Sequence, residues 1–275
     1  MDKTSFTSIA YDYPSKSIVV GGYTWDSTVS TFASSSDQHA IIALIDNNNI
    51  FKWKKRVSGY KNIEALTFGN DNNQIYALMK SDNDQKIMIV KRYDGAFITM
   101  MVIVSYDIME QSLQIVSDEQ GYIYCTYQNS QGNFRILKLK YNGSTGTAEG
   151  IRIKNDQENS NGYALQYFGK QSMKQILVGG YLKKQNVSRP FLFNFDSDTN
   201  FKVNFGQMLS QSDKSHCFIR DIDLESSSTQ TTVHTCSQFQ TPKHIIYSRL
   251  KYNNTFIVNG QDHFTYQDND KQIEC

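Results

Sequence analysis

The sequence has little proline, no surplus of either charge and no long apolar run. Proline occurs only 3 times, whereas Tyr occurs 17 times and Phe 16 times, a balance that suits β-strands with aromatic packing. Lys and Arg together number 28 against 27 for Asp and Glu, a net charge of +1, which argues against a nucleic-acid surface. No stretch approaches the roughly 18 apolar residues of a membrane-spanning helix, so no direct membrane insertion is expected.

Sequence motifs for catalysis are also missing. The chain has no Gly-x-Ser-x-Gly elbow, no glycine-rich phosphate loop that opens a helix and no His-Glu-x-x-His motif. Its first ten residues show neither the basic nor the apolar region of a signal peptide. With 275 residues, the chain can bury enough surface to fold without a metal or a disulfide. We therefore expect no cofactor, and an enzyme is not predicted, although residues on several repeats could still assemble a site.

One motif occurs twice. The run Ile18–Tyr23 (IVVGGY) returns as Ile176–Tyr181 (ILVGGY), at a distance of about three steps of roughly 53 residues. Weaker copies at Ile75–Leu78 and Ile123–Thr126 occupy the intermediate steps. A period near 50 that is built from short β-rich runs is typical of a β-propeller.

Each repeat reads as four antiparallel strands. In the first repeat, we predict strands at Phe6–Tyr11, Ser17–Thr24, His39–Ile45 and Ile50–Val57, with turn residues between them. The same order predicts one propeller domain over residues 1–275 with almost no helix. Its five blades lie approximately at residues 5–58, 61–105, 110–155, 161–209 and 215–260, with a partial sixth repeat at 262–275.

The turns between third and fourth strands are the most regular landmark. They begin with Asp or Asn, namely Asp46, Asp94, Asn142, Asp196 and Asn253. The pairs Asp94-Gly95 and Asn142-Gly143 predict two-residue turns with positive φ at both centres. We interpret these carboxylates and amides as turn formers rather than as catalytic or metal-binding groups.

The end of the sequence resembles the start of a repeat. The order of His263–Gln267 and Ile273–Cys275 matches that of residues 6–20. Two interpretations follow: the chain is a piece of a longer protein, which we favour, or its last strands close the ring against the first blade.

A family resemblance follows from the best-defined stretch, Ile18–Lys55. Its Gly-Tyr-Thr strand end, its Ala-Ile-Ile-Ala-Leu-Ile-Asp strand and its Asn-rich turn before Trp53 resemble the seven-bladed β-propeller repeat family often labelled SBBP. The match is partial in the second and third repeats, returns at Ile176–Asp196 and fades after Cys217. The resemblance implies a scaffold or adhesion module in a larger protein and no activity.

The connections between blades and the loops between second and third strands are expected to emerge on one face, where propellers generally bind ligands. Five side chains there could anchor a partner, as Tyr, Trp and Arg often do: Trp25, Tyr60, Tyr106, Arg189 and His216. Each could equally be an ordinary rim or packing residue.

The cysteines leave several interpretations open. Pairing two strands across the turn near Ser227 sets Cys217 almost opposite Cys236, so that a disulfide is plausible if their Cα atoms lie within about 7 Å. Free buried thiols are equally acceptable, whereas the histidines nearby lack zinc-ligand spacing. Three sequons, at Asn142, Asn186 and Asn253, lie in predicted turns or loops. With a disulfide they would favour an extracellular or cell-surface location.

We therefore expect a non-catalytic β-propeller scaffold that binds a protein or a glycan within a larger surface or secreted assembly. The alternative is a propeller hydrolase or lyase that acts on carbohydrate, with carboxylates in the central channel; Asp221 and Asp223 share one strand face. A third possibility is an intracellular assembly platform with reduced cysteines. In each case we expect a protein or glycan partner and no nucleic acid.

Overall fold

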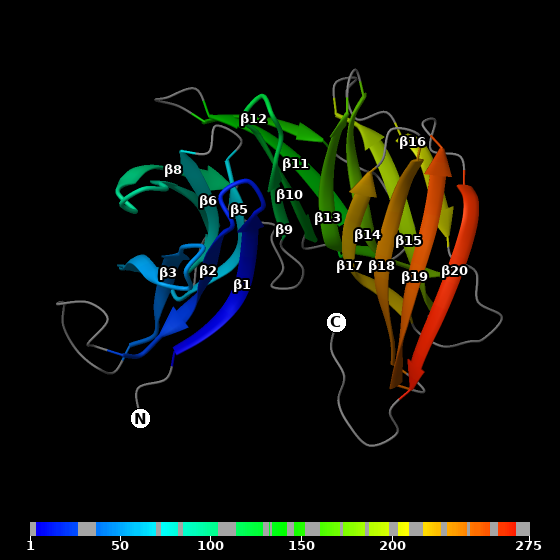
Figure 1. Cartoon of the computed structure of the whole chain (residues 1–275), viewed down its shortest axis with the longest axis horizontal. Helices are drawn as coiled ribbons and strands as arrows, with labels where there is room; N and C mark the ends of the chain where they lie inside the picture. The colour runs from blue at the N-terminus through cyan, green and yellow to red at the C-terminus, as the bar shows by residue number, and fades with distance from the viewer. Residues whose placement is uncertain are drawn as a thin grey trace. The chain divides into compact units, whose positions relative to one another are not determined.

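A computed structural model of the chain describes residues 4–26, 37–69, 73–81, 85–103, 114–128, 132, 134–141, 146–151, 160–170, 173–184, 187–197, 203–208, 217–226, 230–240, 243–253 and 258–267. Throughout these ranges the secondary structure consists of strands and the turns between them (Figure 1). In this part of the chain, nothing helical has the length and apolarity that crossing a bilayer requires.

The strands form five antiparallel sheets of four, and each sheet takes its strands in chain order (Figure 1). The first sheet holds β1 (Thr4–Asp12), β2 (Ser17–Thr24), β3 (His39–Ile45) and β4 (Phe51–Val57). The second holds β5 (Asn62–Phe68), β6 (Gln74–Lys80), β7 (Gln85–Lys91) and β8 (Phe97–Ile103). The third holds β9 (Gln114–Ser117), β10 (Tyr122–Gln128), β11 (Phe134–Tyr141) and β12 (Gly146–Ile151).

The last two sheets have longer strands. The fourth sheet holds β13 (Ser160–Lys170), β14 (Met173–Lys184), β15 (Val187–Asp196) and β16 (Val203–Met208). The fifth holds β17 (Cys217–Ser226), β18 (Gln230–Gln240), β19 (Lys243–Asn253) and β20 (Val258–Gln267). The first four sheets occupy the stretches predicted for the first four repeats, whereas the fifth sheet extends beyond residue 260 to Gln267. In the first sheet the strand bounds agree with the predicted ones to within two residues.

Two expectations from the sequence differ from the structure. Val258–Gln267 is one strand, β20, whose residues pair with β19 as far as Gln267 opposite His244. Residues 262–267 therefore complete the fifth sheet instead of opening a new repeat. The turn after β7 is also wider than two residues, because Lys91 N–H donates to Ala96 O (2.8 Å). Of the expected pair, Gly95 has φ of +65° and Asp94 has no positive φ, so the turn is not of type I′. Its Asn142 counterpart lies outside the described residues.

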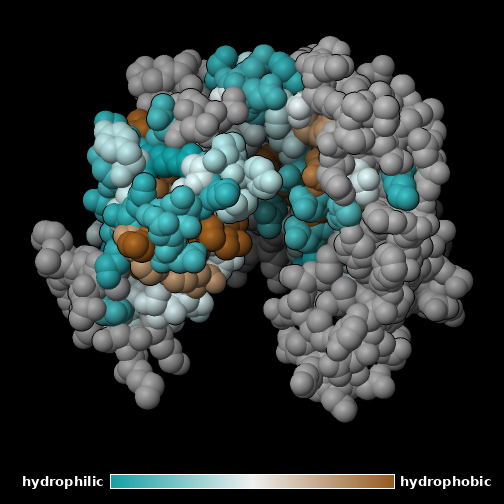
Figure 2. All heavy atoms as spheres, in the orientation of Figure 1, coloured by the Kyte–Doolittle hydropathy of each residue, from teal (hydrophilic) through white to brown (hydrophobic). Residues whose placement is uncertain are grey.

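The chain divides into two compact units, which we describe separately. The first comprises Met1–Ile108, Leu113–Cys125 and Leu137–Gly150; the second comprises Met109–Ser112, Thr126–Ile136 and Ile151–Cys275. In the first unit, apolar side chains of the first two sheets form one core, including Val19, Ile42, Trp53, Ile63 and Met79. Outside this core, hydrophobic groups of the first unit also appear at the surface, bordered by hydrophilic ones (Figure 2). In the second unit, the fourth and fifth sheets share a core that includes Leu177, Leu192, Ile219 and Val233.

The repeated Gly-Gly pair has the same packing role in both units. A Cβ on Gly21 would lie 2.6 Å from Ile63 Cγ2 of the next sheet, and a Cβ on Gly179 would lie 2.6 Å from Ile219 Cγ2. A Cβ on Gly22 or Gly180 would instead overlap a backbone carbonyl oxygen of the first strand of its own sheet. The first glycine thus lets neighbouring sheets approach, and the second lets β1 or β13 approach its partner strand.

The turn carboxylates act as expected from the sequence. Asp46 Oδ1 accepts hydrogen bonds from the backbone N–H groups of Asn48 (2.8 Å) and Ile50 (3.0 Å), and Asp94 Oδ1 accepts one from Ala96 N–H (2.8 Å). The same arrangement occurs at the turn after β9, where Asp118 Oδ1 accepts hydrogen bonds from Gln120 and Tyr122. These side chains replace missing backbone partners within the turn.

Replacing Asp46 by alanine is expected to lower the free energy of unfolding by about 1 kcal/mol, because two backbone donors lose their acceptor at an exposed turn. Urea unfolding followed by circular dichroism measures this change. Asp46→Asn is the matched control, since its amide oxygen still accepts both hydrogen bonds. An alanine variant as stable as the asparagine variant would contradict the assignment.

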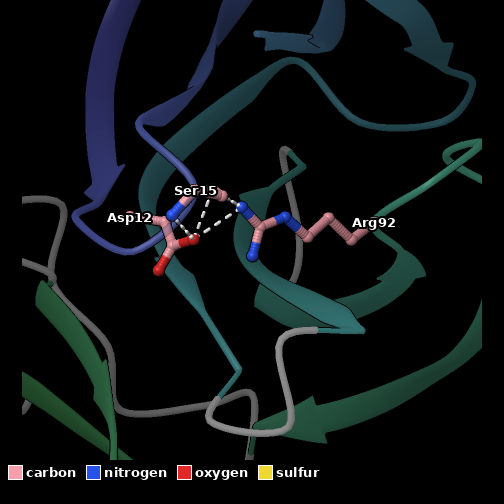
Figure 3. A network of polar contacts seen from close by, with 3 residues as sticks. All are labelled: Asp12, Ser15 and Arg92. Atoms are coloured by element: carbon pink, nitrogen blue, oxygen red, sulfur yellow. Dashed lines mark hydrogen bonds and ion pairs between the residues drawn. The ribbon is translucent and has the colours of Figure 1, made fainter. Parts of the chain in front are cut away.

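A buried ion pair joins two turns of the first unit (Figure 3). Arg92 donates to Asp12 Oδ2 at 2.6 Å, and the exposed fractions of the two side chains are only 11% and 9%. Ser15 donates to the same oxygen through its hydroxyl (2.5 Å) and its backbone N–H (3.2 Å), and Arg92 also contacts Ser15 Oγ. The guanidinium lies 4.6 Å from the centre of the Phe68 ring. The network links the β1–β2 turn of the first sheet to the turn after β7 in the second.

A bulge-built cluster at the strand ends

The first strand of a sheet carries a β-bulge near its start wherever its register is described in full. The register shifts lie between Phe6 and Ser8, Ile63 and Ala65, Gly162 and Ala164, and Ile219 and Asp221. One residue in each strand is therefore extra, and a bulge of this kind redirects a side chain. The four extra residues are Thr7, Glu64, Tyr163 and Arg220.

In the second unit, the two bulge residues lie against each other. The guanidinium carbon of Arg220 lies 4.1 Å from the centre of the Tyr163 ring, a cation–π contact between the fifth and fourth sheets. The ring of Tyr163 in turn lies 5.7 Å from that of Tyr181, tilted by 33°. We call Gln128, Tyr163, Tyr181 and Arg220 the rim cluster, because it lies where β13 and β17 begin and β10 and β14 end.

Backbone contacts fix the amide of the rim cluster. Gln128 is buried, and its Nε2 donates to the carbonyl oxygens of Gly132 and Ser160, both at 3.0 Å. Ser160 is itself held, since its hydroxyl oxygen accepts a hydrogen bond of 2.9 Å from Phe134 N–H. These two hydrogen bonds fix the orientation of the Gln128 side chain, which also contacts Tyr181.

The environment keeps Tyr181 protonated. Burial raises the pKa of Tyr181, and neighbouring Tyr163 raises it further, whereas Gln128 and the charge of Arg220 oppose the shift. A tyrosine hydroxyl is a hydrogen-bond donor at neutral pH in any case, and the raised pKa extends this state to higher pH. Tyr163, Tyr181 and Arg220 are each half-buried, so part of every side chain faces solvent. The cluster combines two aromatic faces, one cation and polar groups on a rigid base.

The first unit carries different chemistry at the equivalent positions. Thr7 Oγ1 donates to Ile63 O (2.8 Å) and to Asn62 Oδ1 (3.2 Å), and Asn62 Nδ2 donates to Glu64 Oε1 (3.0 Å). At the bulges of the first and second sheets, the side chains therefore form a series of hydrogen bonds that includes no aromatic ring. The β-bulge thus recurs from sheet to sheet, but the side chain of its extra residue differs.

The residues predicted from the sequence to bind a partner differ in burial. Trp25 follows β2, is half-buried, and packs edge-on against Tyr23 with ring centres 5.0 Å apart. Tyr60 is only 7% exposed and belongs to the first core, so it packs sheets together and offers little surface to a partner. Arg189 is exposed on β15. Tyr106 and His216 lie outside the described residues.

The rim cluster was missed in the sequence analysis except for one signal. Tyr181 follows the repeated Gly-Gly pair, as Tyr23 does in the first unit, so the repeat marked its position. Nothing in the sequence indicated Tyr163 or Arg220, because the bulges that turn them outward depend on strand register.

The register of the fifth sheet differs from the one expected for the cysteines. Cys217 pairs with Phe239, and Cys236 pairs with Asp221. The two cysteines are thus offset by about 10 Å along the strands at roughly 3.4 Å per residue, which does not favour a direct disulfide. Their side chains lie outside the described part, so the bond stays a prediction. Cys125 is a free, buried thiol, and burial raises its pKa.

The paired carboxylates on β17 show one perturbed group. Desolvation raises the pKa of Asp221; the hydrogen bond from Ile222 N–H (2.9 Å) opposes this effect, and the charge of Asp223 adds to it. Both aspartates are exposed over much of their surface. In the described part of the chain, no three His, Cys, Asp or Glu side chains converge as metal ligands would.

Comparisons with known proteins agree on the architecture. No family model and no curated protein matches the chain. Among solved structures, the chain is similar to the Dos1 propeller over 98% of its length, with 12% identity and a TM-score of 0.57. It is similar to a functionally unknown protein from Desulfotomaculum acetoxidans over 95% of its length (11% identity, TM-score 0.55). A third match is the SapL1 lectin in complex with alpha methyl fucoside, over 92% of the chain (13% identity, TM-score 0.51).

These matches span 63%, 70% and 78%, respectively, of the chains compared. The present chain therefore covers less than two thirds of the Dos1 propeller. At such low identity the matches show the fold alone. Together with the five four-stranded antiparallel sheets, they confirm that the chain has the all-β propeller fold predicted from its repeat, while the resemblance to the SBBP repeat family stays a prediction.

Proposed function

We propose that the chain is a non-catalytic propeller module that holds a partner protein at the rim cluster. The observation that supports this proposal is the cation–π and ring stacking of Arg220, Tyr163 and Tyr181. Tyr and Arg are the residue types that dominate binding energy at protein interfaces, and here two sheets and a buried amide hold them in place. Such preorganisation lowers the entropic cost of binding.

A glycan is the second candidate ligand. The half-buried faces of two tyrosines beside an amide and a guanidinium group suit a small polar ligand with apolar faces. The SapL1 match contributes the fold only, so this candidate also depends on the rim cluster of this chain. A third candidate, hydrolysis of carbohydrate, has in its favour only the raised pKa of Asp221 beside Asp223.

The test uses affinity capture from an extract of cells that express the protein, with quantitative mass spectrometry. We expect the double variant Tyr163→Ala/Arg220→Ala to reduce capture of the specific partner at least about 10-fold, equal to 1.4 kcal/mol or more. Lys174→Ala is the matched control, because Lys174 is a half-buried cation of the same unit near the opposite end of β14 from Tyr181. Thermal unfolding of each variant shows whether the fold persists.

Equal capture by the wild type and by a folded double variant would contradict the proposal. A glycan array read with the same three proteins separates the candidates: binding to a glycan that disappears only in the double variant would favour the glycan. Loss of a measured glycosidase activity in Asp221→Asn, with capture unchanged, would favour the enzyme.

A further inference from the structure

Two aromatic rings meet where β2 ends. Tyr23 and Trp25 lie edge-on, with ring centres 5.0 Å apart and ring planes at 78° to each other, and both side chains are half-buried. The backbone after Trp25 is held, since Asp26 N–H donates to Thr24 Oγ1 (3.0 Å). We call Tyr23 and Trp25 the aromatic corner. The faces of Tyr and Trp rings attract cations, so a corner of two rings favours a positively charged ligand.

This end of β2 lies beside the start of β5 in the second sheet. A Cβ on Gly21 would lie 2.6 Å from Ile63 Cγ2, and Tyr23, two residues further along the strand, shares the side of Gly21. Thr7 of β1 joins the two sheets at the same level, because its Oγ1 donates to Ile63 O (2.8 Å) and to Asn62 Oδ1 (3.2 Å). Tyr23 therefore lies next to the first residues of β5.

The fourth and fifth sheets show which residue comes to this place. Tyr181 is the counterpart of Tyr23, since both follow the Gly-Gly pair. The extra residue of the next bulge, Arg220, lies on the Tyr163 ring, which stacks against Tyr181. The extra residue of the bulge that follows the first sheet is Glu64. The repeat therefore places a carboxylate beside Tyr23 where it places a guanidinium group beside Tyr181.

Glu64 is held in place and partly desolvated. Its side chain is half-buried, and its Oε1 accepts a hydrogen bond of 3.0 Å from Asn62 Nδ2. A carboxylate at reduced solvent exposure attracts a cation more strongly than one in bulk water. Thr7 occupies the bulge position that Tyr163 has in the fourth sheet, and its short side chain does not fill the space that the tyrosine ring takes there.

We propose that the aromatic corner and Glu64 together bind a quaternary ammonium group. The ring faces contact its methyl groups, and the carboxylate balances its charge. Such a group has no N–H to satisfy, so one carboxylate and two rings suffice for it, whereas a primary ammonium brings three donors. Both flanking sheets belong to the first unit and the rim cluster belongs to the second, so this proposal and the proposed function stand or fall independently.

The test is isothermal titration calorimetry of the whole chain with choline and with 3,3-dimethyl-1-butanol, its uncharged isostere. We expect choline to bind at least about 10-fold more tightly than the isostere. Trp25→Ala should weaken choline binding by about 10-fold or more, and Glu64→Gln should remove most of the preference for the charged ligand. Glu119→Gln is the matched control, because it removes an exposed carboxylate of the same unit, in the turn after β9.

Two further arms complete the experiment. Thermal unfolding shows whether each variant is folded, and Glu64→Gln keeps the test decisive if Trp25→Ala is not. A glycine-flanked peptide with Nε-trimethyllysine identifies the source of the group: tighter binding than choline supports the proposal with a side chain of a partner protein, and weaker binding supports it with a small molecule.

Three results would overturn the proposal. The first is no choline binding, or equal affinity for choline and its isostere. The second is choline binding that neither Trp25→Ala nor Glu64→Gln changes. The third is choline binding that occurs only in Lys80→Met. Lys80 lies opposite Asn62 on β6, so this result would mean that the lysine itself occupies the aromatic corner.

Discussion

Replacing Gly180 by alanine is expected to lower the free energy of unfolding by about 3 kcal/mol or more. The added Cβ would overlap the carbonyl oxygen of Asn161 and crowd the Cα atom of Gly162. Both are backbone groups of β13, so no rotamer change can relieve the contact, and the strand pair must separate. Urea unfolding measures the loss, and Gly22→Ala should show a similar loss through the carbonyl of Ser5.

The matched control is Gly121→Ala. Gly121 has φ of +78° with nothing within 4 Å of the Cβ position, so only the backbone cost of about 1–2 kcal/mol applies. If Gly180→Ala does not fold, Gly179→Ala still tests the packing, since its Cβ meets the side chain of Ile219 at 2.6 Å. Ile219→Ala should then offset part of the loss in a double-mutant cycle. Equal losses at Gly121 and Gly180 would refute the close-approach explanation.

Replacing Arg92 by methionine is expected to cost about 3 kcal/mol, because the buried carboxylate of Asp12 loses its counter-charge. Methionine keeps an apolar contact with the Phe68 ring, so the loss reports the charge rather than the packing. The double variant Asp12→Asn/Arg92→Met should recover part of the stability, since no uncompensated charge remains. A double variant no more stable than Arg92→Met would show that the ion pair is not the cause.

The same network predicts an acid-sensitive stability. Burial alone would raise the pKa of Asp12, but hydrogen bonds from Ser15 and Arg92 and the charge of Arg92 outweigh it and lower the pKa. A lowered pKa means that the unfolded chain binds the proton first, so the contribution is complete above about pH 4 and is lost as the pH falls. Denaturation midpoints between pH 6 and pH 2 should fall less for Asp12→Asn than for the wild type.

The sequence predicted the parts of the fold that depend on local patterns. Short apolar runs between turn residues placed Ser17–Thr24 and His39–Ile45 where the structure has β2 and β3, and Asp46 marked its turn correctly. The same patterns failed at Val258–Gln267, because a long strand and two short ones have similar local composition. Pairing with β19, which is a long-range contact, decides between them.

The candidate site depends on features that local patterns do not record. Tyr163 and Arg220 turn toward each other because each is the extra residue of a bulge, and a bulge is defined by the partner strand. Tyr60 was expected on the rim, but its backbone carbonyl accepts a hydrogen bond from Ala40 N–H (2.8 Å) and its ring enters the core. An aromatic residue next to a turn can therefore either pack in the core or contact a partner, and the sequence alone does not distinguish these two roles.

The lysines of β4 have a consequence for solubility. β4 ends its sheet, and a terminal strand with unpaired amides could recruit strands from other molecules into an aggregate. Exposed Lys52, Lys54 and Lys55 oppose such growth, since stacking identical strands would bring like charges within about 5 Å of one another. Acetylation of these amines would remove their charge and with it this protection.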